Sequence, residues 1–295
     1  MVCESSSDAF LFYSFENDEV ITLGKWHDFF DFEIRTIEEL HYLYDVMADF
    51  YVDKVRNLVY LEKRNANNAS CEAAYRNKKN WYALHATVEY DENGKPKHKL
   101  ICIRDISKFK RQNEELAYLA YYDPLTGLYN RNYFVRLLGE YIRNAQDDDK
   151  TVSVMIVDID DFRKVNDGMG MVAGDELVQQ MGGSLKEFTN ANVIVSHINS
   201  DIYCIAIYDP KNDYSVENIY QRILARMKRP FYLSNGSEIN VTVSVGVASY
   251  PEASKDALEL INCAEIVMFK GKAMGKNRIQ YFDTPILNDF LQNVM

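Results

Sequence analysis

The sequence contains few of the features that mark secreted, metal-cluster or membrane-spanning proteins. It has only five cysteines in 295 residues, an odd number, and none follows a CxxC or Cys/His metal spacing. No apolar run is long enough to span a bilayer, and the first residues lack the basic-then-apolar order of a secretory signal. We therefore expect a cytoplasmic protein with reduced thiols and no membrane partner. The cysteines are Cys3, Cys71, Cys102, Cys204 and Cys263.

Positive charge is also scarce. The 44 Asp and Glu residues outnumber the 33 Lys and Arg residues, which gives a net charge of −11. A negative surface repels phosphate backbones, so we expect no nucleic-acid partner, although a local cationic pocket for a small nucleotide is compatible with this charge. With 47% hydrophobic residues, the chain has enough apolar material for two compact domains.

The first part of the chain mixes strand and helix patterns and predicts an α+β domain over residues 8–107. Residues 9–23 predict two short strands around the turn Glu16-Asn17-Asp18. Residues 37–61 predict one amphipathic helix, because their apolar positions are spaced by three and four residues. Further strands are predicted at 81–88 and 100–103, with a turn at 91–94 between them.

Residues 106–120 carry the spacing of a coiled-coil seam. Apolar residues and one asparagine recur at intervals of three, four, three and four, at Ile106, Phe109, Asn113, Leu116 and Ala120. An asparagine on such a seam lowers stability but fixes register and oligomeric state. We assign 108–121 as a signalling linker helix and expect a homodimer through helix 106–120. The alternative is a single amphipathic helix that packs on its own domain.

From Tyr122 onward, strands and helices alternate. The pattern predicts an α/β sandwich over 122–284, with a mainly antiparallel central sheet flanked by helices, as in ferredoxin-like and polymerase-palm domains. A short apolar tail, 285–295, follows. The predicted helices are 131–145, 172–189, 215–228 and 256–273, and the predicted strands are 152–157, 193–198, 202–208 and 241–245.

Acidic residues follow two of these strands. Asp158, Asp160 and Asp161 come at the end of an apolar strand, and Asp201 lies in the tight turn of a hairpin. Because unpaired buried charge is costly, such carboxylates form either a metal site or a helix-capping cluster. Two acidic strand ends side by side fit two-metal nucleotidyl transfer, in which hard divalent ions bind carboxylate and phosphate oxygens.

Five ordered motifs lie between residues 121 and 283. They are DPLTGLYNR at 123–131, DIDDFRKVND at 158–167, Gly170 with Gly174 and Asp175, VSVGVA at 243–248, and FKGK at 269–272 with GKNR at 275–278. In this order and spacing they resemble the GGDEF family, the diguanylate cyclase fold. The resemblance implies a C-terminal domain that handles guanine nucleotides.

The resemblance also implies roles for individual residues. Asp158 and the carbonyl of Ile159 would bind a metal ion, with Asp201 as the second carboxylate. Asn166 and Asp175 would hydrogen-bond the guanine edge, and the triphosphate would be contacted by Arg163, Lys272 and Lys276. The cofactor would be Mg²⁺ with GTP, since carboxylates bind hard cations and lysine and arginine neutralise phosphate charge.

The sequence departs from the family at its eponymous loop. The Gly-Gly-Asp/Glu-Glu-Phe positions fall on Asn199, Ser200, Asp201, Ile202 and Tyr203. Both glycines are lost, although glycine tolerates a positive φ that serine seldom adopts. Ile202 replaces the second acid and can neither bind a metal nor move a proton. His197 stands where the family has an arginine, and no Arg-x-x-Asp precedes the loop. We therefore expect a degenerate GGDEF domain.

The front domain ends in Cys102-Ile103-Arg104-Asp105-Ile106-Ser107, which resembles the end of a PAS sensory domain before its output helix. We expect Asp105 to brace the sheet end or cap the following helix. Neither the scattered histidines nor Cys71 follows a recognised haem or flavin pattern, so the PAS ligand is not identified by the sequence.

Three functions remain open. The first is a cyclic di-GMP signalling module, in which the PAS-like domain governs a degenerate GGDEF domain that binds GTP without efficient turnover and acts with an EAL-type phosphodiesterase. The second is an active diguanylate cyclase with a divergent loop. The third is a dimerisation scaffold that binds no nucleotide.

Overall fold

The computed structural model describes residues 7–60 and 68–283, so the predicted tail at 285–295 lies outside the described residues. The chain divides into two compact units, with the division between Leu116 and Ala117. None of the helices in the described parts is both long enough and apolar enough to cross a membrane. The four cysteines in these parts, from Cys71 onward, are free thiols.

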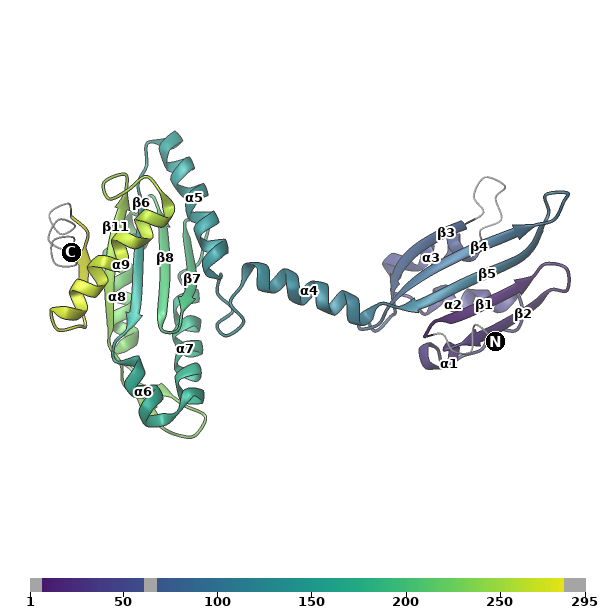
Figure 1. The fold of residues 1–295 in the computed structure, drawn as a ribbon, viewed down its shortest axis with the longest axis horizontal. Helices are drawn as coiled ribbons and strands as arrows, with labels where there is room; N and C mark the ends of the chain where they lie inside the picture. Colours follow the sequence, from purple (N-terminus) through teal and green to yellow (C-terminus); the bar gives the residue numbers. More distant parts are fainter. Residues whose placement is uncertain (1–6, 61–67, 284–295) are drawn as a thin grey trace, which may run out of the picture. The chain divides into compact units, whose positions relative to one another are not determined.

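The N-terminal unit is an antiparallel five-stranded sheet with three helices packed against one face (Figure 1). Its strand order, β2-β1-β5-β4-β3, places the first hairpin beside the last strand. The elements are β1 Ala9–Ser14, β2 Glu19–Gly24, α1 Trp26–Phe29, a 3-10 turn at Glu38–Leu40, α2 His41–Asp45, α3 Asp49–Val59, β3 Asn68–Ala74, β4 Trp81–Tyr90 and β5 Pro96–Asp105.

The core of this unit follows from strand alternation. Every second residue of β4 is buried, beginning with Tyr82, and the first three of these side chains belong to the same core cluster as Trp26 and Phe30. The indole N–H of Trp26 donates to the Phe32 carbonyl at 2.7 Å, which satisfies the polar atom of a side chain only 1% exposed. The predicted strands and turns of this unit are therefore present.

The single helix predicted over 37–61 is wrong. The chain leaves the helical conformation at Ala48, whose backbone is extended with φ −65° and ψ 143°. There the Ala48 N–H donates to the Ala74 carbonyl at 2.9 Å, and Met47 forms a bridge with Tyr75. The end of β3 therefore supplies hydrogen bonds that compete with helix continuation, and Phe50 of the predicted apolar face is 76% exposed.

Helix α4, Ser107–Tyr121, follows the sheet. The Asp105 carboxylate accepts from the Ser107 N–H at 2.7 Å, so the expected brace at the start of this helix is confirmed. On the predicted seam, Phe109 is 56% and Leu116 is 64% exposed. The apolar seam thus faces solvent in the single chain.

The C-terminal unit contains a second five-stranded sheet, in the order β12-β11-β6-β8-β7. Only the β11–β12 pair is parallel, so the predicted mainly antiparallel sheet is confirmed. Its elements are α5 Arg131–Asp148, β6 Val152–Ile159, α6 Phe162–Met169, α7 Met171–Lys186, β7 Val193–Asn199, β8 Ile202–Tyr208, a 3-10 turn at Asn212–Tyr214, α8 Val216–Met227, β9 Phe231–Tyr232, β10 Glu238–Ile239, β11 Val243–Tyr250, α9 Ala257–Ala273 and β12 Ile279–Tyr281.

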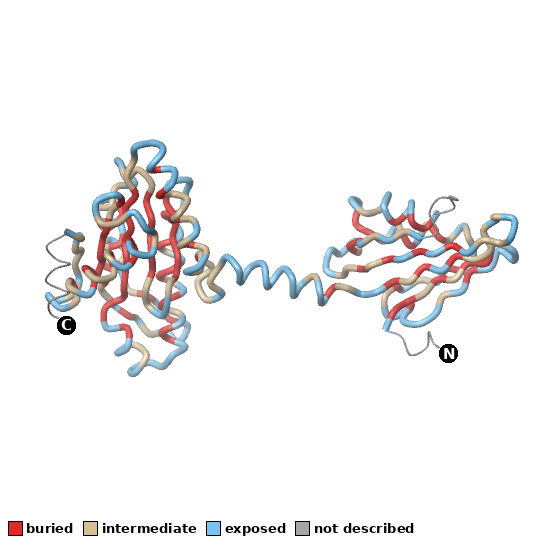
Figure 2. The backbone as a smooth tube through the Cα atoms, turned by 45° about the horizontal axis from the view of Figure 1, so that its top comes forward, coloured by how far each residue is buried: buried red, intermediate tan, exposed pale blue. Residues whose placement is uncertain are grey.

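Helices cover both faces of this sheet. Alternate residues of β6 pack against α7 and α8 on one face, and the others pack against α5 and α9 on the opposite face. All eight residues of β6 are buried as a result, and Figure 2 shows burial concentrated in these strands. On β11, a Cβ at Gly246 would lie 2.0 Å from the Ala264 carbonyl oxygen, so glycine is required for α9 to pack this closely.

Candidate functional site

The predicted metal ligands meet where β6 ends beside the β7–β8 hairpin. Asp158 pairs in register with Ile202 of β8 and with Ser244 of β11. One residue later, the Ile159 N–H donates to the Asp201 carbonyl at 3.2 Å. The strand end and the hairpin tip are therefore joined by backbone hydrogen bonds, which brings residues from two separate motifs together.

Asp158 is a buried carboxylate with one cationic partner. Its side chain is 4% exposed, and its Oδ1 lies 2.5 Å from Nζ of Lys272 near the end of α9. Burial raises the pKa of Asp158 to about 7, the Lys272 ammonium opposes that rise, and the negative charge of Asp201 adds to it. The site therefore holds a carboxylate that is poorly solvated and near its titration midpoint at neutral pH.

Asp160 has a different role from its neighbour. It is 4% exposed and accepts hydrogen bonds from the hydroxyls of Thr242 and Ser244, at 2.6 and 2.7 Å, and from the Asn277 N–H at 3.0 Å. These donors engage both of its oxygens. Asp160 is therefore a structural brace that ties β6 to β11 and to the loop after α9.

Asp161 precedes helix α6 but makes no capping hydrogen bond with its side chain. Instead it forms ion pairs with Lys276 at 2.8 Å and Lys164 at 3.0 Å, which lower the pKa of its carboxyl group. The predicted triphosphate residue Lys276 is thus held at the mouth of the site by Asp161. Its backbone has a positive φ of 62°, in the loop that follows α9.

The residues predicted to contact guanine lie on α6 and α7. The Asn166 Oδ1 atom is buried without a hydrogen-bond partner in the described parts of the chain. A Cβ at Gly174 would lie 1.9 Å from it, so glycine there makes room for this side chain. Asp175 follows on the exposed side of α7, whereas Arg163 is 93% exposed and lies 3.6 Å from Asp167.

The hairpin tip adopts the turn without its glycines. Ser200 takes a positive φ of 46°, the conformation that we expected serine to avoid. His197 holds this turn from below: its Nε2 lies 3.0 Å from the Ser200 carbonyl, and its Nδ1 lies 3.0 Å from an oxygen of Asp123. The His197 ring therefore lies between the first motif and the loop, with one ring nitrogen within hydrogen-bond distance of each.

The last two loop positions serve the core. Ile202 is half-buried and packs against the cluster formed by α5, α9 and the sheet. Tyr203 is fully buried, and its hydroxyl donates to the Val178 carbonyl of α7 at 2.7 Å. Neither side chain offers a carboxylate to the site.

The sequence prediction missed the roles of His197 and Asp160. The sequence shows His197 as a replacement for an arginine, and its partner Asp123 belongs to a motif 74 residues earlier, so local pattern does not predict their contact. Asp160 was grouped with its neighbours as an acidic cluster. Ser244 offered a signal in the sequence, because a hydroxyl buried within a strand requires a hydrogen-bond partner.

Asp158 and Asp201 are the carboxylates at this end of the sheet that could contribute to a divalent cation site. Within residues 7–60 and 68–283, no three His, Cys, Asp or Glu side chains gather closely enough to hold a metal unaided. Magnesium sites commonly use one or two carboxylates and take their other ligands from substrate phosphates and water. Asp158 and Asp201 could supply these carboxylates. Without a metal ion, Lys272 balances the charge of Asp158.

Comparison with known proteins now adds to this geometry. A model of the family described as "Diguanylate cyclase, GGDEF domain" matches residues 120–278. The chain belongs to the GGDEF family. Among its curated relatives is "Cyclic di-GMP phosphodiesterase NbdA" of Pseudomonas aeruginosa, which is 29% identical over 182 residues, or 62% of this chain and 23% of that protein.

"Diguanylate cyclase TpbB" of Pseudomonas aeruginosa is 26% identical over 181 residues, or 61% of this chain and 42% of that protein. The chain thus spans less than half the length of both relatives. The solved GGDEF domain of PA1120 (TpbB or YfiN) has a TM-score of 0.55 and 23% identity, and the match covers 58% of this chain and 99% of that one. This structural likeness establishes that the fold of the C-terminal unit is that of a GGDEF domain.

Proposed function

We propose that the chain is a cyclic di-GMP signalling module whose GGDEF domain is degenerate: it binds GTP with Mg²⁺ but converts it inefficiently. The observation that carries this proposal is that only one of the two acidic positions of the loop keeps a carboxylate. Asp201 remains beside Asp158, whereas the second acidic position is Ile202, which packs into the core. A metal–phosphate site is retained, and a group able to move a proton is absent from that position.

Nucleotide binding would rearrange the ion pairs of the site. Asp158, the Ile159 carbonyl and Asp201 would hold the metal ion, which would neutralise the carboxylate and release Lys272 toward the phosphates. Lys276 is already at the same edge through Asp161. The bound cation would thus take the place of the Lys272 ammonium group, and the negative charge of the buried Asp158 would remain balanced.

Guanine would be bound at the α6–α7 corner. Asp175 can accept from the guanine N1–H and N2–H₂ groups, and Asn166 can contribute its amide. The Asn166 Oδ1 atom has no hydrogen-bond partner in the described residues, which favours a ligand-binding role over a packing role. Arg163 is exposed on α6 and is free to turn toward the triphosphate.

The N-terminal unit would act as a PAS-like sensory domain, residues 8–107, connected by the linker helix at 108–121. Its exposed seam, which includes Phe109 and Leu116, supports a homodimer through this helix, because dimerisation would bury both side chains. NbdA is a cyclic di-GMP phosphodiesterase, which supports the proposal that an EAL-type phosphodiesterase is a partner.

The experiment measures GTP affinity by calorimetry and cyclic di-GMP by chromatography in the same preparation, with Mg²⁺ present. We expect binding without appreciable product, and loss of binding in Asp175→Ala. Product above that of an Asp158→Ala control would refute the proposal and identify an active cyclase, the alternative that the retained Asp158 and Asp201 favour. Absence of both binding and product would identify a scaffold.

A further inference from the structure

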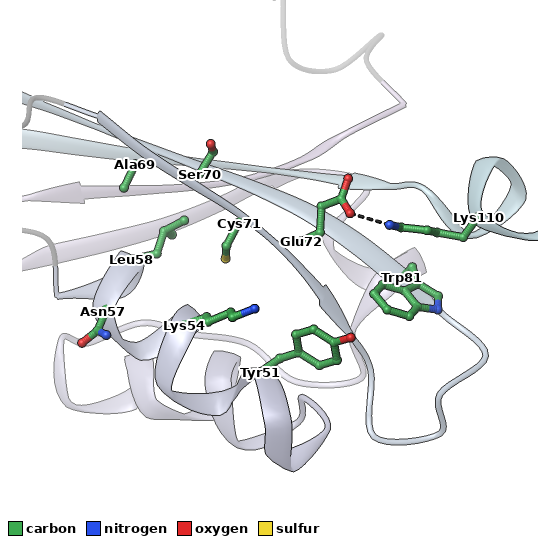
Figure 3. A pocket seen from close by; sticks show the side chains of 10 residues that line it. All are labelled: Tyr51, Lys54, Asn57, Leu58, Ala69, Ser70, Cys71, Glu72, Trp81 and Lys110. Carbon is green, nitrogen blue, oxygen red and sulfur yellow. Dashed lines mark hydrogen bonds and ion pairs between the residues drawn. The ribbon is translucent and has the colours of Figure 1, made fainter. Parts of the chain in front are cut away.

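A cavity of about 790 Å³ lies in the N-terminal unit between helix α3 and strand β3. Its volume is within the usual range for small-molecule sites. Figure 3 shows the side chains that line it, which come from α3, β3, β4 and the first turn of α4, with Cys71 pointing toward Lys54. Those that carry its chemistry are Tyr51, Lys54, Cys71, Glu72, Trp81 and Lys110.

The cavity runs along the edge of the sheet and borders the core at Leu58. β3 is the terminal strand in the order β2-β1-β5-β4-β3, so one row of its backbone groups faces away from the sheet. Cys71 pairs with the buried Leu84 and shares its face, whereas Glu72 pairs with Ala83 on the opposite face. Because both residues line the cavity, it borders both faces of the edge strand.

Two lysines lie over aromatic rings on its wall. The Lys110 ammonium is 4.9 Å from the centre of the Trp81 ring, and the Lys54 ammonium is 5.6 Å from that of Tyr51. The Tyr51 and Trp81 rings are themselves in edge contact at 5.4 Å. The wall is therefore a continuous aromatic surface that carries two positive charges.

These charges are only partly balanced. Lys110 forms an ion pair with Glu72 at 2.5 Å. Across the described ranges of the chain, no acidic side chain lies within ion-pair distance of Lys54, so the charged side chains described along the cavity are two lysines and one glutamate. The protein as a whole carries −11, which makes a cationic cavity lined by aromatic rings a specific local feature.

We propose that this cavity binds a small organic anion with a flat apolar body, such as an aromatic carboxylate. The carboxylate would accept hydrogen bonds from Lys54 and Lys110, and the ring would pack on Tyr51 and Trp81. Such a ligand supplies both the negative charge that Lys54 lacks and an apolar face for the aromatic wall.

Binding would act on the linker helix. Lys110 is the fourth residue of α4, and a ligand carboxylate competes with Glu72 for its ammonium group. Ligand binding would thus weaken the ion pair that joins Glu72 of β3 to Lys110 of α4. This site is separate from the nucleotide site, so its test does not depend on whether the GGDEF domain binds GTP.

Calorimetry with 1-naphthoate tests the proposal on the full chain. We expect saturable binding that weakens about tenfold in Lys54→Gln, the loss of roughly one charge-assisted hydrogen bond. The matched control is Lys79→Gln, which removes an exposed lysine of the same unit outside the cavity and should leave affinity unchanged. The neutral isostere 1-naphthalenemethanol should bind at least several-fold more weakly.

Two further measurements distinguish this site from others. Glu72→Gln removes the competitor for Lys110 and should tighten 1-naphthoate binding several-fold. Naphthoate should also slow alkylation of Cys71 by N-ethylmaleimide, read by peptide mass spectrometry, without slowing that of Cys263. Absence of binding, equal affinity in Lys54→Gln, or unprotected Cys71 at saturating naphthoate would each overturn the proposal.

Discussion

Replacing Asp158 by Asn is expected to stabilise the C-terminal unit in metal-free buffer above neutral pH. The pKa of Asp158 is raised from 3.8 to about 7, mainly by burial, so the folded state binds its proton more tightly than the unfolded state. The contribution of this proton to the free energy of unfolding is complete below pH 3.8 and is lost as the pH rises through about 7. At higher pH the fold must hold a poorly solvated charge.

The size of the effect follows from that shift. A rise from 3.8 to about 7 is about three units, and each unit corresponds to about 1.4 kcal/mol, which gives an upper value of about 4 kcal/mol. The variant leaves Lys272 without its partner, but that side chain is 23% exposed and can reach water. We therefore expect a gain of about 2 kcal/mol near pH 8 and almost none near pH 4.

The two units can be followed separately during urea denaturation. Both tryptophans, Trp26 and Trp81, lie in the N-terminal unit, so their fluorescence reports on that unit alone. Far-ultraviolet circular dichroism reports on both units. Asp158→Asn should shift the circular dichroism transition at high pH and leave the fluorescence transition in place.

Asp160→Asn is the matched control. Its carboxylate already accepts hydrogen bonds from Thr242, Ser244 and Asn277, and an amide group would lose at least one of them. This variant should therefore be destabilised by roughly 1–3 kcal/mol near pH 8, where Asp158→Asn should be stabilised. If Asp158→Asn were no more stable than the wild type near pH 8, the reasoning on the buried charge would be refuted.

Three further variants test the packing of the site. Gly174→Ala should push Asn166 aside, because the added Cβ would lie 1.9 Å from its Oδ1, and calorimetry should show weaker GTP binding with the fold intact by circular dichroism. His197→Phe removes a buried link to Asp123 and should cost about 2 kcal/mol while speeding amide exchange at the hairpin tip; unchanged exchange would contradict that role. Tyr203→Phe removes one buried hydrogen bond and should cost about 1 kcal/mol in urea denaturation, without affecting nucleotide affinity.

Local sequence pattern was sufficient for most of the C-terminal unit. The apolar run that became β6 is buried on both faces, and its continuous hydrophobicity reflects this double burial. Asn130 accepts from the Tyr133 N–H at 2.9 Å and caps α5, and Asp256 caps α9 in the same way. Signals that act within a few residues of chain were therefore readable from the sequence.

The N-terminal unit shows where such patterns fail. β3 has the sequence NASCEAA, rich in small residues with little strand propensity, and no strand was predicted there. It becomes a strand because β4 offers a hydrogen-bonding edge along its whole length. The Ala74 carbonyl at the end of β3 also accepts from the Ala48 N–H, which interrupts the helix predicted over 37–61. The formation of β3 therefore accounts for both the missed strand and the interrupted helix.

The sequence by itself determined the family, the main helices and strands of the C-terminal unit, and the retained and lost acids of the loop, because motif order and local periodicity are properties of the chain. Only the tertiary structure determined the different partners of the carboxylates at the end of β6. Asp158 and Asp160 are two residues apart, yet one faces Lys272 and the other is enclosed by hydroxyls of β11 and its preceding loop. Their partners lie 82 to 117 residues away, and such contacts exist only once the sheet has formed and α9 has packed against it.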